Sequence, residues 1–331
     1  MPTSPPAETI TRLFDAVYPS FAMLAAMELD LFNTLADNRS TATQIADALD
    51  VEVSKIRPLL YALVVAGLLT IEDDMFANTP ETEHYLVKGM PDYLGGLTGL
   101  TSNNWMRILD TAKTIRAGAT LEKYDYHAPS QEELIALFRG LYPGAVADAH
   151  RLMEAYDFSS DKTVLDVGGG SGALAITIAE ANSHLKATVM DLQSATTIAK
   201  QFVDEADMKE SVEVLTADAV YDKLPGLYDV VVARHLIQVL SEEDSRRLLK
   251  NLATIVKPGG VIHIIGWILD NSRLTPANIV NYNLILLNAY DDGQAYTEQE
   301  YHNWLILAGF EAFERTVFSN GTSIITAHKP A

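Results

Sequence analysis

The hydrophobic pattern of the chain changes character near residue 157. Before this point apolar residues recur at helical spacing, and residues 9–35 alone predict two helices. After it, short apolar runs alternate with helical segments, and this alternation is typical of a parallel sheet with crossover helices. The predicted strands are Thr163–Val167, Ala187–Met190, Val212–Leu215, Tyr228–Ala233 and Val261–Trp267.

Residues 41–80 predict a winged helix. Thr41, followed by Gln44, forms a capping-box pattern at the start of the first helix, and a second helix follows after a turn. Leu68–Ile71 and Met75–Ala77 then predict a short hairpin around residues 72–74. Residues 95–155 continue mainly helical, with glycine and proline breaks.

The end of the chain predicts a hairpin at Asn320-Gly321 and an antiparallel last strand, Ser323–His328. The expected fold is therefore α/β, a Rossmann-like sheet with an antiparallel last strand, preceded by a mainly helical winged-helix domain. We expect three segments: 1–110 as the helical module, 111–155 as a connector that lines the site, and 156–331 as the ligand-binding α/β domain. The apolar helical faces of the first segment exceed what one winged helix can bury, which predicts a homodimer.

Composition narrows the function. The 331 residues include no cysteine, which excludes disulfides, thiolate zinc sites and a catalytic thiol. A net charge of −20 disfavours nucleic acid and anionic membranes, and residues 41–80 carry two positive against six negative side chains, the wrong sign for a DNA-reading helix. Neither a signal peptide nor a membrane-spanning run is recognisable, so we expect a cytoplasmic protein with a small-molecule ligand.

The chemistry is concentrated where predicted strands end. Residues 164–172, VLDVGGGSG, form a buried strand that enters a glycine turn, and Gly168, Gly170 and Ala173 fit a pattern shared by nicotinamide- and S-adenosylmethionine-binding proteins. Asp191 follows the next strand, where a carboxylate can accept hydrogen bonds from ribose hydroxyls in either class. Asp218 follows the third strand and suits the exocyclic amine of an adenine, which favours S-adenosylmethionine.

These motifs, together with YDVVVARHLIQVLSEED at 228–244 and VKPGGVIHI at 256–264, resemble class I S-adenosylmethionine-dependent small-molecule O-methyltransferases that carry an N-terminal winged-helix dimerisation domain. The resemblance implies S-adenosyl-L-methionine as cofactor and a homodimer. It also implies that the glycine loop holds the methionine part, that the two acids bind ribose and adenine, and that a basic residue after the fourth strand contacts the cofactor. The implied cofactor residues are Asp166, Gly168, Gly170, Asp191, Leu192, Asp218, Ala219 and Arg234.

The sequence departs from that family at the general base. Gln238 occupies the position of the catalytic histidine, and Gly266 and Ala295 occupy those of the two acids that orient it. Glutamine cannot take a proton near neutral pH, whereas a thioether or a neutral amine can attack a methyl group without first losing one. We therefore expect S-methylation of a thioether, similar to the family members that methylate 4-methylthio-2-hydroxybutyrate in bacterial dimethylsulfoniopropionate synthesis.

Other functions remain open from the sequence. The first alternative is an O- or N-methyltransferase of an aromatic secondary metabolite. A relative that binds the cofactor without methylating, a nicotinamide dehydrogenase and a DNA-binding regulator are the others. Whether S-adenosylhomocysteine or NADH raises the melting temperature would distinguish a protein that binds S-adenosylmethionine from a nicotinamide dehydrogenase.

Six residues are candidates for contact with the acceptor. The resemblance places Tyr142 and Gln238 near the transferred methyl and Trp105 on a helix that faces the pocket, while Arg139, with Arg107 and Arg151, could bind a substrate carboxylate. His235 lies three residues before the base position and is expected to be structural. The histidines show no metal-binding spacing, so no metal is expected.

Overall fold

The computed structural model describes residues 6–90, 92–123 and 130–331, and these residues divide into two compact units between Ser102 and Asn103. In the first unit a three-stranded antiparallel sheet, in the order β1-β3-β2, packs with helices around Leu31, Phe32, Ile45, Leu60 and Leu63. Its elements are α1 (Glu8–Asp15), α2 (Val17–Glu28), α3 (Leu31–Thr34), β1 (Ser40–Thr41), α4 (Ala42–Leu49), α5 (Val53–Val65), β2 (Leu69–Glu72), β3 (Met75–Asn78) and α6 (Pro80–Leu86).

The predicted capping box is confirmed at the start of α4. The Thr41 hydroxyl accepts the Gln44 N–H at 3.3 Å, and Gln44 Oε1 accepts the Thr41 N–H at 2.8 Å. Two backbone donors that the helix cannot satisfy are thereby paired. The predicted succession of helix, turn, helix and hairpin is also found.

The second unit is built on a seven-stranded sheet in the order β6-β5-β4-β7-β8-β10-β9. The strands from β4 to β8 are parallel, and β10 runs antiparallel to both of its neighbours, as predicted. The strands are β4 (Thr163–Val167), β5 (Lys186–Asp191), β6 (Val212–Thr216), β7 (Tyr228–Arg234), β8 (Val256–Trp267), β9 (Glu311–Val317) and β10 (Thr322–His328).

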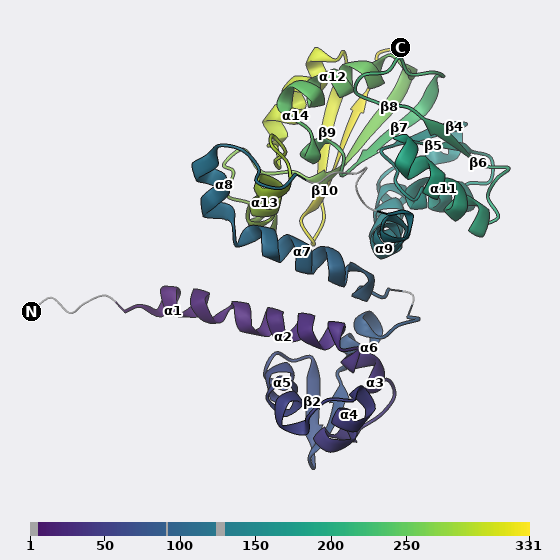
Figure 1. The fold of residues 1–331 in the computed structure, drawn as a ribbon. Coiled ribbons are helices and arrows are strands. Elements are labelled where there is room, and N and C mark those ends of the chain that lie inside the picture. Colours follow the sequence, from purple (N-terminus) through teal and green to yellow (C-terminus); the bar gives the residue numbers. More distant parts are fainter. Residues whose placement is uncertain (1–5, 91, 124–129) are drawn as a thin grey trace, which may run out of the picture. The chain divides into compact units, whose positions relative to one another are not determined.

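Helices cover both faces of this sheet, and each face has its own apolar core (Figure 1). One core includes residues of α9 (Gln131–Ala155), α10 (Ala173–Ala181) and α11 (Gln193–Glu205), and the other includes residues of α12 (Glu242–Ala253) and α14 (Glu298–Leu307). The remaining helices are α7 (Thr98–Ile108), α8 (Thr111–Ala117) and α13 (Ala277–Ala289), with short 3₁₀ turns at Gly95–Leu97, Phe158–Ser160 and Ile237–Val239. None of the helices in the described ranges is long and apolar enough to cross a membrane.

The strand order determines where a ligand can bind. The chain moves outward in one direction from β4 through β5 to β6, and then continues on the other side of β4 with β7 and β8. Such a reversal opens a crevice at the carboxyl ends of the strands, because the connections on its two sides diverge. The glycine loop and both predicted acids follow strands that end at this edge.

Candidate active site

The glycine loop after β4 has a backbone that other residues would strain. Gly168 and Gly170 have φ values of +65° and +56°, in the left-handed region. A Cβ on Gly168 would lie 3.2 Å from the side chain of Leu236, and one on Gly170 would lie 3.1 Å from Phe138. Glycine therefore lets the loop backbone form one wall of the crevice.

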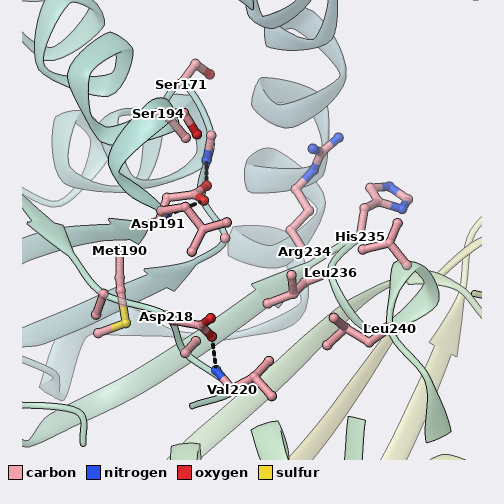
Figure 2. A pocket seen from close by; sticks show the side chains of 18 of the residues that line it. Ser171, Met190, Asp191, Ser194, Asp218, Val220, Arg234, His235, Leu236 and Leu240 are labelled. Atoms are coloured by element: carbon pink, nitrogen blue, oxygen red, sulfur yellow. Dashed lines mark hydrogen bonds between the residues drawn. The ribbon is translucent and has the colours of Figure 1, made fainter. Parts of the chain in front are cut away.

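Asp191, at the end of β5, fixes this loop from the opposite side. Its Oδ2 accepts the N–H of Gly170 at 2.8 Å, and its Oδ1 accepts the N–H of Leu192 at 2.7 Å (Figure 2). Burial raises the pKa of the carboxyl, and these two N–H groups oppose that rise. Each carboxylate oxygen can accept a further bond, so Asp191 can still receive ligand hydroxyls.

Asp218 follows β6 and organises the next turn. Its Oδ1 accepts the N–H of Val220 at 2.9 Å (Figure 2) and that of Tyr221 at 3.2 Å, and its own N–H donates to Asp222 at 2.8 Å. With both bonds on Oδ1, Oδ2 is available to a donor in the crevice.

A cavity of about 420 Å³ lies at this edge of the sheet. It brings together seven of the eight predicted cofactor residues: Gly168, Gly170, Asp191, Leu192, Asp218, Ala219 and Arg234. Apolar side chains complete its wall, among them Leu134, Phe138, Leu141, Leu236 and Leu240. The cavity thus combines polar groups at the strand ends with apolar side chains from α9 and from the segment after β7, and its volume is in the range of small-molecule sites.

Asp166, the eighth predicted residue, lies beneath the loop rather than in the cavity wall. It is 1% exposed, and the described residues offer no hydrogen-bond partner to either carboxyl oxygen. Burial raises its pKa to about 7, although Arg234 acts in the opposite direction. A buried carboxyl without partners is costly, so this position suits a donor group supplied by a ligand or by water.

A cluster of charged side chains joins the end of β7 to α9. Asp148, whose side chain is only 4% exposed, accepts Arg234 Nε at 2.8 Å and Arg151 Nη1 at 2.7 Å, and His235 Nε2 lies 3.7 Å from its Oδ2. Burial favours the neutral acid, but His235 and Arg234 hold the pKa of Asp148 at about 2. Asp148 is therefore ionised throughout the physiological range.

The position of the missing base is buried. Gln238 is 5% exposed and is not part of the cavity lining; its Oε1 accepts the N–H of Trp267 at 3.3 Å and faces His235 Nδ1 at 3.2 Å. A Cβ on Gly266 would lie 3.3 Å from that oxygen, so the absent acid would have stood beside it. Ala295 is buried, and its N–H donates to Asn283.

The other predicted acceptor residues do not reach the cavity. The ring of Tyr142 stacks on Phe202 at 5.6 Å, and Arg139 donates to both carboxylate oxygens of Glu205 at 2.9 and 3.0 Å. Trp105 lies on α7, outside the lining. Burial raises the pKa of Tyr142, which keeps the phenol protonated.

Sequence reasoning did not single out Asp148, and it set His235 aside. The signal for Asp148 was an acid within the apolar face of a long helix, three residues before Arg151. The signal for His235 is visible only in the backbone, where φ is +51°. In the described ranges no group of three histidine, aspartate or glutamate side chains is arranged to hold a metal ion.

Comparison with known proteins agrees with this geometry. Residues 110–311 match the O-methyltransferase domain, and residues 11–88 match the O-methyltransferase dimerisation domain. The chain is 28% identical over 309 residues to the 3-hydroxy-5-methyl-1-naphthoate 3-O-methyltransferase of Streptomyces sahachiroi, covering 91% of this chain and 88% of the relative. It is 26% identical over 338 residues to the N,N-dimethyltransferase OxyT of Streptomyces rimosus, covering 98% and 97%.

Among solved structures, human N-acetylserotonin methyltransferase in complex with S-adenosylmethionine superimposes with a TM-score of 0.87 at 23% identity, with both chains fully covered. Fold and site define a methyltransferase that depends on S-adenosylmethionine. The chain belongs to the O-methyltransferase family. The family name does not determine the acceptor atom, since OxyT is named for transfer to nitrogen.

The residues present fit this cofactor. The glycine loop leaves space where a Cβ would intrude, two carboxylates face the crevice from successive strand ends, and Asp166 lacks a donor. Once bound, the cofactor supplies an electrophilic methyl group on a positively charged sulfur.

Proposed function

We propose that this protein methylates an oxygen or nitrogen of an aromatic small molecule, such as a secondary metabolite, with S-adenosylmethionine as donor. The cavity is the observation that carries this proposal. Besides the glycine loop, the acids, Arg234 and His235, its wall includes several leucines, Phe138 and Tyr290, and these apolar side chains suit a flat apolar ring. The relatives described above are named for a naphthoate oxygen and for nitrogen.

In this proposal Gly168, Gly170, Leu192 and Ala219 shape the cofactor pocket, and Asp191 and Asp218 accept the ribose hydroxyls and the adenine amine. Asp166 and Arg234 serve the methionine end, and Gln238 acts indirectly because it is buried. The dimerisation domain and the apolar stripe of α1, which exposes Ile10, Leu13 and Phe14, support a homodimer.

A thioether acceptor is the second candidate, and one observation favours it. Gln238, Gly266 and Ala295 leave position 238 without a base, and a thioether has no proton to remove. The same observation is compatible with an amine, and it is compatible with an oxygen acceptor if another residue takes the proton. The named activities of the two relatives favour oxygen and nitrogen.

The test offers three acceptors in parallel with methyl-labelled donor: 3-hydroxy-5-methyl-1-naphthoate, tryptamine and 4-methylthio-2-hydroxybutyrate. We expect label on the naphthoate oxygen or the amine. S-adenosylhomocysteine should raise the melting temperature, and NADH should not. Label on the thioether alone would favour the second candidate, and no binding of S-adenosylhomocysteine would refute both.

A further inference from the structure

His235 lies in the cavity wall directly after β7, next to the position where the family's base is missing. Its N–H continues the sheet ladder by donating to Ile265 O at 2.7 Å, but its φ of +51° then turns the chain. A histidine in the left-handed region is strained, and such strain concentrates at functional sites. Figure 2 shows His235 beside Arg234, both pointing away from Asp218.

The partners of the ring determine its tautomer. Gln238 Oε1 accepts the backbone N–H of Trp267, which can only donate, so the amide orientation is determined. The atom that faces His235 Nδ1 at 3.2 Å is therefore an acceptor, and Nδ1 carries the proton in the neutral ring, because Nε2, 3.7 Å from Asp148 Oδ2, is beyond hydrogen-bond distance of that carboxylate. In the neutral ring Nε2 is then left with its lone pair.

The surroundings of Nε2 stabilise a proton that arrives there. Asp148 Oδ2 is 3.7 Å away, and Asp148 is ionised. The charged groups around the ring are Asp148 on α9, Arg234 on β7, and Arg151, which pairs with Asp148 from α9. Burial and Arg234 lower the pKa of His235, so the ring is neutral at pH 7, while Asp148 and Gln238 raise it.

We propose that His235 is the general base of this enzyme, positioned by Asp148 and Gln238, for acceptors that carry a proton on oxygen or nitrogen. This inference rests on the proposed function. In the transfer, the acceptor's lone pair forms a bond to the methyl carbon, and the carbon–sulfur bond breaks with its electron pair remaining on sulfur. The acceptor's proton moves to Nε2, which produces an imidazolium between Gln238 and Asp148.

The arrangement explains the departures from the family pattern. A Cβ on Gly266 would lie 3.8 Å from His235 Nδ1 and 3.3 Å from Gln238 Oε1, so glycine leaves room for this pair. The His235 ring packs at 4.8 Å against Trp267, which itself packs on Tyr282. Its side chain remains 21% exposed, which provides a path for the proton to leave.

The first test does not depend on turnover. In protein labelled with ¹⁵N-histidine, with S-adenosylhomocysteine bound, the nitrogen shifts of His235 report its tautomer and pKa, and loss of the signal in His235→Asn assigns it. We expect a neutral ring at pH 7.5 with its proton on Nδ1, and a pKa lower by about one unit or more in Asp148→Asn. A proton on Nε2, or a pKa of His235 that is the same in Asp148→Asn as in the wild type, would overturn the proposal.

The second test measures single-turnover transfer to the same three acceptors. With the naphthoate or tryptamine, His235→Asn should lower the rate about 100-fold or more while S-adenosylhomocysteine still binds. In Asp148→Asn the acidic limb of the pH–rate profile should shift to lower pH, because the pKa of His235 falls. The matched control, His302→Asn on α14, should behave as wild type. A wild-type rate in His235→Asn would remove the base role.

The outcomes distinguish a failure of the proposed function from a failure of the base assignment. Absence of S-adenosylhomocysteine binding overturns the proposed function itself. Binding with oxygen or nitrogen transfer that is insensitive to His235→Asn overturns only the base. Transfer to the thioether alone also overturns the assignment of His235 as general base, because that acceptor has no proton to give. If no acceptor reacts, the ¹⁵N shifts of His235 test the assignment by themselves.

Discussion

Asp191 and Gly170 are 21 residues apart in sequence, and the carboxylate of the first accepts the backbone N–H of the second at 2.8 Å. The acid expected to bind ribose thus also holds the loop expected to surround the methionine part. Ligand affinity and loop conformation therefore depend on one side chain.

Asp191→Ala should weaken the binding of S-adenosylhomocysteine by about 1.5–3 kcal/mol, because it removes charge-assisted bonds to the ligand and the loop's anchor. Titration calorimetry measures the change. Asp204→Ala is the control: Asp204 lies on α11, where it pairs with Lys209 at the surface, and this variant should bind as wild type. Unchanged affinity in Asp191→Ala would contradict the assignment.

Asp166 should make stability fall as pH rises. Its pKa is 3.8 in the unfolded chain and about 7 in the folded protein, so between these values the unfolded state has lost a proton that the folded state keeps. The free energy of unfolding should then decrease by up to about 1.4 kcal/mol per pH unit and level off above pH 7. Asp166→Asn should lack this contribution in urea unfolding between pH 5 and 8; the same slope in both proteins would show that the carboxyl is not protonated.

Arg315 should be a stability determinant of the last hairpin. Its side chain is 4% exposed, and it donates to Asp270 at 2.9 Å, Glu298 at 3.0 Å and Ile268 O at 2.8 Å. Arg315→Met leaves a buried carbonyl without its donor and should lower the free energy of unfolding by about 2–4 kcal/mol. Arg246→Met, which removes only an exposed pair with Glu242, should change it by less than about 1 kcal/mol.

The α1 stripe should support self-association. Phe14 is 72% and Leu13 58% exposed, and none of the residues of α1 is buried. We expect a homodimer in sedimentation at micromolar concentration and a monomer in Phe14→Glu, because a charge cannot be buried in an apolar interface. Thr11→Glu adds the same charge outside the stripe and should stay dimeric; a monomeric wild type would refute the expectation.

Local signals predicted the strands and their order of appearance, the capping box of Thr41, and the parallel sheet with its antiparallel end. They also placed the glycine loop, Asp191 and Asp218 correctly at one edge. These predictions succeeded because each feature depends on a short contiguous segment, and because parallel strands bring their carboxyl ends to the same edge of the sheet. The seven cofactor candidates in the cavity wall, which the family resemblance implied, all lie at such strand ends.

The rotation of α9 could not be predicted in the same way. Phe138, Leu141 and Ala145 line the cavity, whereas Arg139 and Tyr142, on the adjacent face, turn to Glu205 and Phe202 of α11. One residue corresponds to about 100° of rotation around a helix. An error of one position therefore mistakes a residue that packs against α11 for one that lines the cavity.

The sequence by itself determined the class of fold, the cofactor and the absence of a histidine at position 238, since all three depend on residue type within short motifs. Only the tertiary structure decided what stands near that position. Asp148 and Arg234 are 86 residues apart, and they meet, with His235 beside them, because α9 packs against the end of β7. A pairing across two elements depends on their packing, which no local pattern records.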